Sequence, residues 1–270
     1  MAPKASVVVC TWNRPDSLAR CLASLKQQTE QRYELILRPE RGPLAVIRNR
    51  GLSVARGPVV CFIDDDTVCP PGWLAGVLAG FRHGADVIGV SGPAIIPEAS
   101  RQHRDLYRWH GLRLCYERIF IDRPDLPGHI SRSGAPTLAS SDATNRYTGP
   151  VTYLEACNMS FRTNELRAVG GFDEGFQDLA EWCEPDVCFR LRQAFPGSVC
   201  WYSHAAGLRH EPSPAGATAL RRGTGSRLAN YQRFAERWVP PSPASRRYRT
   251  FLRTYYRWLD LQSFLARRLS

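Results

Sequence analysis

The chain has 270 residues, 43% of them hydrophobic, which is sufficient for the core of one large α/β domain or two small ones. No apolar run approaches the roughly 20 residues that span a bilayer, and the N-terminal apolar run of about six residues is too short for a secretory signal. The nine cysteines occur singly, without the spacing of zinc ligands, so we expect reduced thiols in a cytoplasmic protein.

The formal net charge is +11, and almost all of the positive charge comes from arginine, since Lys4 and Lys26 are the only lysines. This excess points to an acidic partner, whether nucleic acid, an anionic membrane surface or a phosphorylated substrate. Arginine favours bidentate contacts with phosphate. Charge alone does not choose among these partners.

Residues 1–92 alternate between short apolar runs and stretches whose apolar residues recur at helical spacing. The apolar runs, which predict strands, are 5–11, 33–38, 58–63 and 85–92. The stretches that predict helices are 13–28, 43–56 and 71–84. This alternation predicts an α/β fold with a mainly parallel sheet and helices on both faces. In such sheets, ligands bind beyond the carboxyl ends of the strands.

The rest of the chain is less regular. Residues 97–150 are rich in Arg, Pro, Ser and His and show weak periodicity, which predicts a loop-dominated insertion. Residues 150–162 and 198–203 predict strands that return to the core, and residues 184–195 predict a helix with Pro185 at its first position.

Three consecutive carboxylates, Asp64, Asp65 and Asp66, follow the strand predicted at 58–63. Like charges about 4 Å apart repel by on the order of 1–4 kcal/mol. The cluster therefore indicates a bound cation, and hard divalent ions such as Mg²⁺ or Mn²⁺ prefer carboxylate oxygen. Because alternate side chains of an extended segment point the same way, we expect Asp64 and Asp66 to face one site and Asp65 another. The alternative is a solvated acidic turn that caps the next helix.

The sequence resembles the inverting family 2 glycosyltransferases with the GT-A fold. The segments that carry the resemblance are, in order, "SVVVCTWNRPDSLARCLASLKQQ", "RNRGLSVARGPVVCFIDDDTVCPPGWL" and "NMSFRTNELRAVGGFDEGF" with the following "EWCEPDVCFRLR". The resemblance covers roughly residues 5–211 and rests on the ordered set, because a DxD motif alone is a weak signal. It implies a GT-A-type single domain with a mixed, mainly parallel sheet. It also implies transfer from a nucleotide-sugar donor, with a UDP-sugar favoured, to a hydroxyl acceptor such as a glycan, a lipid-linked sugar or a small metabolite, with Mn²⁺ or Mg²⁺ as cofactor.

The resemblance also implies roles for individual residues. Asp66 matches the metal-binding Asp of the family's DxD motif, Asp64 matches the position near the donor ribose, and Asp65 matches the residue near the sugar or the ribose. The other positions matched to donor binding are Thr11, Asn13, Arg14, Arg48 and Asn49.

One segment departs from the family pattern. Relatives usually carry Asp-Gly-Ser or a similar triplet after the second strand, where the Asp holds the base, but this chain has "LILRPERGP". Glu40 is the candidate replacement, and the identity of the base stays open.

An inverting transfer needs a base that accepts the proton of the acceptor hydroxyl. The resemblance puts that base at the start of the helix after "GGFDE", where Glu184 aligns best, Asp186 follows two residues later and Glu181 is a third candidate. A helix N-terminus favours an ionised carboxylate by about 0.3–1 kcal/mol. The alternative is capping of the helix by acidic residues with no catalytic role.

Two further groups follow the last predicted strand. Many relatives have an additional metal-binding His at the position of His210, and His204 is its rival. Arg221 and Arg222 lie shortly after and are candidates to clamp the diphosphate. A solvated basic loop is the alternative for this pair.

The C-terminal segment has the pattern of a basic amphipathic helix. At about 100° per residue, one side carries Arg246, Arg249, Arg253 and Arg257, and the opposite side carries Tyr248, Leu252, Tyr255 and Leu259. The apolar side either packs on the domain or lies on an anionic membrane near a lipid-linked acceptor. We therefore divide the chain into a donor-binding half (1–97), an acceptor-binding and catalytic half (98–215) and a basic helical tail (216–270).

Two other classes of function compete with sugar transfer. A nucleotidyltransferase has similar metal and nucleotide needs, but it commonly opens with a Gly-rich loop and a Lys after the first strand, and "TWNRPDS" has neither. A non-catalytic nucleic-acid binder would leave the acidic clusters unexplained, and the sequence has no nucleic-acid-binding motif. We therefore expect no nucleic-acid partner. A degenerate transferase that binds donor without turnover also stays open.

Overall fold

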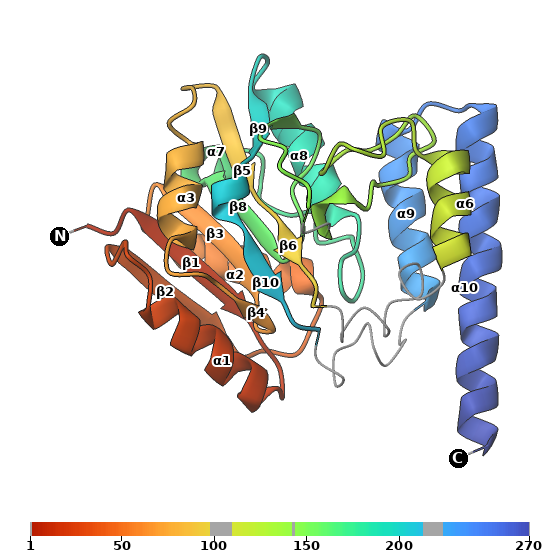
Figure 1. Cartoon of the computed structure of the whole chain (residues 1–270), viewed down its shortest axis with the longest axis horizontal. Helices are drawn as coiled ribbons and strands as arrows, with labels where there is room; N and C mark the ends of the chain where they lie inside the picture. Colours follow the sequence, from red (N-terminus) through yellow and green to blue (C-terminus); the bar gives the residue numbers. More distant parts are fainter. Residues whose placement is uncertain (1, 98–109, 142–143, 213–223, 270) are drawn as a thin grey trace.

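The computed structural model describes residues 2–97, 110–141, 144–212 and 224–269 (Figure 1). Its centre is a seven-stranded sheet with the strand order β2-β1-β3-β8-β5-β9-β7. In that order the strands are β2 (Tyr33–Arg38), β1 (Ala5–Cys10), β3 (Val59–Asp64), β8 (Asn158–Arg162), β5 (Val87–Ser91), β9 (Val199–Tyr202) and β7 (Gly149–Val151).

The sheet is mixed. β1 pairs in parallel with both β2 and β3, and β5 pairs in parallel with β9, whereas β8 and β7 run antiparallel to their neighbours. The carboxyl ends of β1, β2 and β3 therefore meet at one edge of the sheet. Asp64 is the last residue of β3, so the acidic run lies at this edge, as the sequence predicted.

Helices cover both faces of the sheet, as predicted (Figure 1). One face packs against α1 (Pro15–Lys26) and α3 (Trp73–Gly80), and the other against α2 (Leu44–Val54), α7 (Thr163–Ala168) and α8 (Cys183–Ala194). Side-chain alternation along β1 divides the two cores, because Val7 and Val9 join the first and Val8 joins the second. Every strand and helix predicted within 5–92 is present.

A second, three-stranded sheet consists of short strands in the order β4-β10-β6. These are β4 (Thr67–Val68), β10 (Leu208–His210) and β6 (Ala94–Ile95). β10 runs antiparallel to β4 and parallel to β6. The sequence contains no signal for these strands, because runs of two or three residues are too short to show a period.

Three helices form a layer beside the sheet (Figure 1): α6 (His110–Phe120), α9 (Thr224–Trp238) and α10 (Pro243–Leu269). Aromatic side chains, including Tyr116, Phe120, Tyr231 and Tyr248, form a third core between them. The prediction that 97–150 is dominated by loops is thus wrong at α6, whose Tyr116 and Phe120 are spaced four apart on one buried side. Residues 98–109 and 142–143 of that segment lie outside the described residues.

The tail forms two helices, α9 and α10, where a single amphipathic tail was predicted. Tyr248, Leu252 and Leu259 of α10 are buried as predicted, but Tyr256 is buried in place of Tyr255, which is only partly covered. The apolar side of α10 therefore packs on the protein along this stretch, the first of the two alternatives.

Two local predictions need correction. The segment 150–162 is not one strand, because a turn separates β7 from β8. Pro185 is the third residue of α8, not the first. Both positions lie within the first turn, where the backbone N–H has no partner in the helix, so proline is tolerated. Within the described residues, no helix is long and apolar enough to cross a membrane.

Candidate active site

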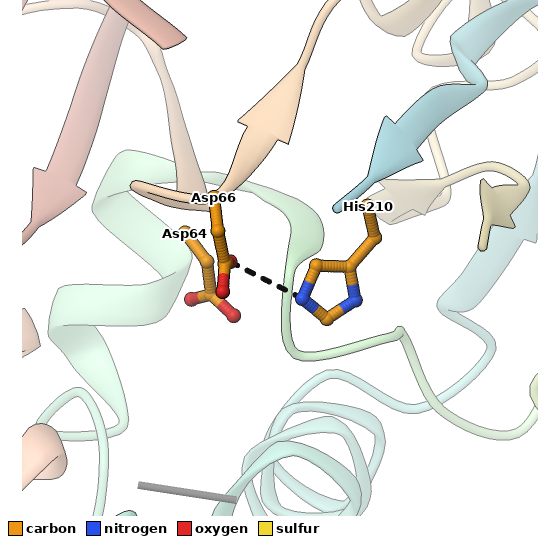
Figure 2. Close-up of side chains that lie close together, drawn as sticks. All are labelled: Asp64, Asp66 and His210. Atoms are coloured by element: carbon orange, nitrogen blue, oxygen red, sulfur yellow. Dashed lines mark ion pairs between the residues drawn. The ribbon is translucent and has the colours of Figure 1, made fainter. Parts of the chain in front are cut away.

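Asp64, Asp66 and His210 lie together at the carboxyl end of β3 (Figure 2). Each offers one ligand atom, and these atoms all lie within 4.8 Å of one another. His210 Nε2 is 3.2 Å from Asp66 Oδ1, and both side chains are largely buried. Two carboxylates and an imidazole form a donor set suited to a divalent ion such as Mn²⁺. The separation of Asp64 and Asp66 from Asp65 agrees with the prediction.

The second sheet brings His210 to the acids. β10 pairs with β4 so that His210 lies opposite Thr67, the residue after Asp66. The backbone N–H of Glu211 donates to the carbonyl of Asp66 at 2.8 Å, and the Thr67 hydroxyl donates to the carbonyl of Asp64 at 2.7 Å. These bonds hold the acidic turn and the histidine in one place, although they are far apart in sequence.

Asp65 is not part of this group of three side chains and is fully buried. The Thr11 hydroxyl donates to Asp65 Oδ2 at 2.6 Å, and the Arg14 guanidinium lies 2.5 Å from Asp65 Oδ1 and 3.1 Å from Asp66 Oδ2. Burial raises the pKa of Asp65 to about 6, although Thr11 and Arg14 act in the opposite direction. Arg14 is thus the local counter-charge of the acidic run and ties the loop after β1 to it.

That loop also presents a residue that the sequence reasoning missed. Trp12 is 54% exposed, directly after the carboxyl end of β1, and Asn13 beside it has a left-handed backbone with φ of 52°. Burial stabilises most tryptophans, so an exposed one next to a candidate site indicates a binding surface. A large aromatic residue directly after a strand was the available signal.

His210 has a second polar neighbour besides Asp66. Burial by itself lowers the pKa of His210, but the nearby Cys157 sulfur and the Asp66 carboxylate outweigh it and raise the pKa. Cys157 is buried and precedes β8. In the sequence, Cys157 is one of nine scattered cysteines, and no spacing distinguishes it.

Glu184 and Arg48 form a buried ion pair. Arg48 Nη1 donates to Glu184 Oε1 at 2.7 Å, and only 2% of Arg48 is exposed. Burial raises the pKa of Glu184, while the Arg48 charge acts in the opposite direction and favours the ionised form. The carboxylate is therefore a stronger base than an exposed glutamate. Asn49, the neighbour of Arg48, donates to the Phe172 carbonyl at 2.8 Å and contacts Glu174.

Asp186 lies in a different environment, although it is only two residues from Glu184. It is fully buried, and it accepts hydrogen bonds from Arg190 Nε at 2.8 Å and Trp238 Nε1 at 2.9 Å, with Arg237 also 3.2 Å away. These contacts join α8 to α9. Its predicted catalytic role stays a prediction, and the geometry assigns it a packing role.

The remaining predicted residues lie outside this cluster. Glu181 forms a bidentate pair with Arg227 of α9. Glu40, after β2, pairs with Arg50 and lies 3.6 Å from Arg38. Its contact with a base stays a prediction.

The sequence also predicted His204 as a rival metal ligand, and Arg221 and Arg222 as a diphosphate clamp. His204 is exposed in the short 3₁₀-helix His204–Ala206 and, among the described residues, is not part of the metal-ligand group. Arg221 and Arg222 lie outside the described residues.

A model of glycosyl transferase family 2 matches residues 6–38 and 36–135 of the chain. The glucosyl-dolichyl phosphate glucuronosyltransferase of Haloferax volcanii is 22% identical over 242 residues, which cover 77% of this chain and 69% of that protein. The pre-mycofactocin glycosyltransferase of Mycobacterium tuberculosis is 26% identical over 172 residues, which cover 64% of this chain and 29% of that protein.

Solved structures share the fold. GalNAc-T7, crystallised with UDP, GalNAc and Mn²⁺, superposes with a TM-score of 0.59 at 13% identity over 88% of this chain and 48% of that one. The mannosyltransferase PcManGT from Pyrobaculum calidifontis, in complex with GDP-Man and Mn²⁺, gives a TM-score of 0.56 at 15% identity over 98% and 74%. At these identities the likeness shows the fold alone. Together with the family model and the curated relatives, it leads to one conclusion: the chain belongs to glycosyl transferase family 2 and is a nucleotide-sugar glycosyltransferase with the GT-A fold.

Proposed function

We propose that the protein is a metal-dependent inverting glycosyltransferase that moves a sugar from a nucleoside-diphosphate donor, with a UDP-sugar favoured, to a hydroxyl acceptor. The observation that carries the proposal is the meeting of Asp64, Asp66 and His210 at the carboxyl edge of the sheet. Two solved structures with this fold were determined with a nucleotide and Mn²⁺, which supports the choice of cofactor.

In this proposal Asp66 and His210 bind Mn²⁺ or Mg²⁺, with Asp64 beside them. A bound divalent ion would neutralise negative charge on the departing diphosphate. The donor lies along the loop after β1, where Asn13 and Arg14 contact it and the exposed Trp12 ring offers a flat apolar surface.

The proposed general base is Glu184. It accepts the proton of the acceptor hydroxyl while the hydroxyl oxygen attacks the anomeric carbon from the side opposite the diphosphate, and the bond between that carbon and the diphosphate oxygen breaks. Arg48 keeps the Glu184 carboxylate ionised, and burial makes it more basic. Arg48 thus acts on the base, and its predicted contact with the donor is less favoured because its guanidinium is buried against Glu184.

The proposed class of acceptor rests on one curated relative and on the exposed side chains near the end of α10. The Haloferax volcanii relative is named for a dolichyl phosphate substrate, so a lipid-linked acceptor is the favoured class. Trp258 and Leu261 of α10 are 37% and 55% exposed, and Arg257 next to them is also exposed. This end of α10 has the aromatic, aliphatic and basic side chains of a peripheral membrane contact.

A thermal-shift series tests the donor and metal assignments together. We expect nucleoside diphosphates and nucleotide-sugars to raise the melting temperature with Mn²⁺ and much less without it, as linkage requires for a ligand that binds the folded state. Stabilisation by nucleoside triphosphates with release of pyrophosphate would instead favour a nucleotidyltransferase. Metal-dependent binding with neither transfer nor hydrolysis would favour a degenerate transferase.

A further inference from the structure

The outer edge of the seven-stranded sheet is a regular strand, and no further strand of the described residues pairs with it. β2 is the end strand, and all six of its residues are in register with β1, without a bulge. Natural proteins protect such edges with lysine, proline, bulges or a covering segment, because unpaired N–H and C=O groups invite another strand. The sequence "YELILR" contains neither lysine nor proline.

The backbone groups on this edge belong to alternate residues. The carbonyls of Arg32 and Arg38 accept hydrogen bonds from the N–H groups of Lys4 and Thr11, on the β1 side. In a parallel ladder alternate residues face the same neighbour, so the even-numbered residues of β2 face β1. The N–H and C=O groups of Tyr33, Leu35 and Leu37 therefore point outward, and no other strand of the described residues pairs with them.

The side chains on this edge are also incompletely covered. Leu35 and Leu37 are 41% and 38% exposed, an unusual amount for leucines in a strand of the main sheet. By alternation they lie on the same face as Tyr33, which packs against the same core cluster as the partly buried Leu18 and Leu22 of α1. The edge thus has both unpaired backbone groups and an apolar surface that continues onto α1.

We propose that this edge binds β2 of a second copy of the chain, in antiparallel orientation, so that two sheets join across a two-fold axis at Ile36. In that register Leu35 of one copy lies opposite Leu37 of the other, and Glu34 lies opposite Arg38. The outward-facing backbone groups of Leu35 and Leu37 then exchange both hydrogen bonds, as residues of a hydrogen-bonded antiparallel pair do.

Charge selects this register among those that the backbone permits. Moving the axis to Leu35 places Arg38 opposite Arg32, and moving it to Leu37 places Glu34 opposite Glu40. Like charges directly opposite each other destabilise a strand pair. Shifts that align odd with even residues lose the hydrogen bonds, because the even residues face β1.

The self-complementary pattern favours a second copy over an unrelated strand. "ELILR" read against its own reverse pairs an acid with a base, leucine with leucine and isoleucine with isoleucine. Glu34 already contacts Arg56 at 2.7 Å, and Arg38 lies 3.6 Å from Glu40. Because both charges have partners within one copy, their pairing across the axis adds little free energy to the dimer. The charges determine the register, and backbone hydrogen bonds and leucine burial supply most of the stabilisation.

The mass in solution is the first test. Light scattering should give twice the chain mass of 30.4 kDa for the wild type, and the chain mass for a variant with both Leu35→Lys and Leu37→Lys. Val54→Lys is the matched control, because Val54 is 51% exposed but lies on α2, and it should remain dimeric. Equal thermal melting of dilute samples establishes that the variants fold. A wild type that stays at the chain mass throughout the micromolar range, or a double variant that stays dimeric, would overturn the proposal.

Cysteine cross-linking tests the register. In a background with the exposed Cys115 changed to serine, Ile36→Cys should form a disulfide with its own copy. Leu35→Cys should cross-link to Leu37→Cys but not to itself. The pair separations, about 4.5 and 5.5 Å between Cα atoms, lie within the range of about 4.4–6.8 Å that a disulfide spans. Self-cross-linking of Leu35→Cys in place of Ile36→Cys would refute this register.

Discussion

The guanidinium of Arg48 donates a 2.7 Å hydrogen bond to the carboxylate of Glu184 inside the protein, where neither side chain is appreciably exposed. Burial opposes the charge on Arg48, but Glu184 raises its pKa, and Asp64 of the acidic run acts in the same direction. The buried Arg48 cation thus acts directly on the proposed base and lies within electrostatic reach of Asp64. This links the two halves of the candidate site through α2.

Glu184→Gln should abolish sugar transfer while leaving nucleotide binding nearly intact. The amide still accepts the hydrogen bond from Arg48, but it cannot accept the proton of the acceptor hydroxyl. It also leaves the buried Arg48 without its counter-charge, so the variant should lose stability, and its activity is compared per folded molecule. Loss of a general base typically lowers kcat by about 10²–10⁴-fold. The measurement is the transfer rate at saturating donor, together with nucleotide binding by calorimetry.

Glu181→Gln is the matched control for that experiment. Glu181 precedes α8 and pairs with Arg227, so its substitution removes an acid near the same helix without touching Arg48. We expect transfer to persist in this variant. Full activity of Glu184→Gln, or inactivity of Glu181→Gln alone, would remove Glu184 from the proposed role.

Asp66→Asn should weaken metal-dependent donor binding. The amide loses the charge that attracts a divalent ion, and its nitrogen is a poor ligand beside His210. Calorimetry with Mn²⁺ and UDP should show at least about tenfold weaker binding, equivalent to about 1.4 kcal/mol. Asp125→Asn is the control, since that side chain is 76% exposed. An unchanged metal titration in Asp66→Asn would exclude Asp66 as a ligand.

The first half of the fold could be predicted from the sequence because its signals are local. β1 and β3 are continuous apolar runs, and the helices between the strands have helical spacing over several turns. The later elements have weaker signals. α6 has only Tyr116 and Phe120 on its buried side, and the turn that separates β7 from β8 carries no proline or glycine.

The sequence indicated which residues belong to the site, but not which of them contact one another. The sequence and the family resemblance together indicated Asp66 and His210, yet only the pairing of β10 with β4 explains why they meet. Nothing local to Arg48 predicts its pair with Glu184, because residues 136 positions apart are brought together by packing of α2 against α8. Likewise, Asp186 looks like Glu184 in sequence, and only the tertiary structure separates their environments.

Asp186→Ala should destabilise the protein. The substitution leaves Arg190, Arg237 and the Trp238 N–H without their buried acceptor. Loss of the acceptor for the Trp238 N–H costs about 1–3 kcal/mol. The two arginines add less, because they are 20% and 39% exposed and keep other partners. Urea denaturation measures the loss. Asp186→Asn keeps an acceptor for Trp238 and should lose less. Transfer per folded molecule should be preserved in Asp186→Asn, and a loss of more than about 10²-fold there would support a catalytic role instead.

Asp173 should make stability depend on acid pH. Burial acts to raise the pKa of this carboxyl, but Arg233, the Gly175 N–H and Arg237 outweigh it and lower the pKa from 3.8 to about 2. The folded state therefore binds the proton less readily than the unfolded chain, so this contribution is complete above about pH 4 and is lost as the pH falls towards 2. Both arginines are more than a third exposed, and solvent screens the interaction to about 1 kcal/mol.

Asp173→Asn should lower the melting temperature by about 2–4 °C at neutral pH, and the difference from wild type should shrink between about pH 4 and pH 2. A difference that stays constant across that interval would show that the charge on Asp173 does not stabilise the junction with α9.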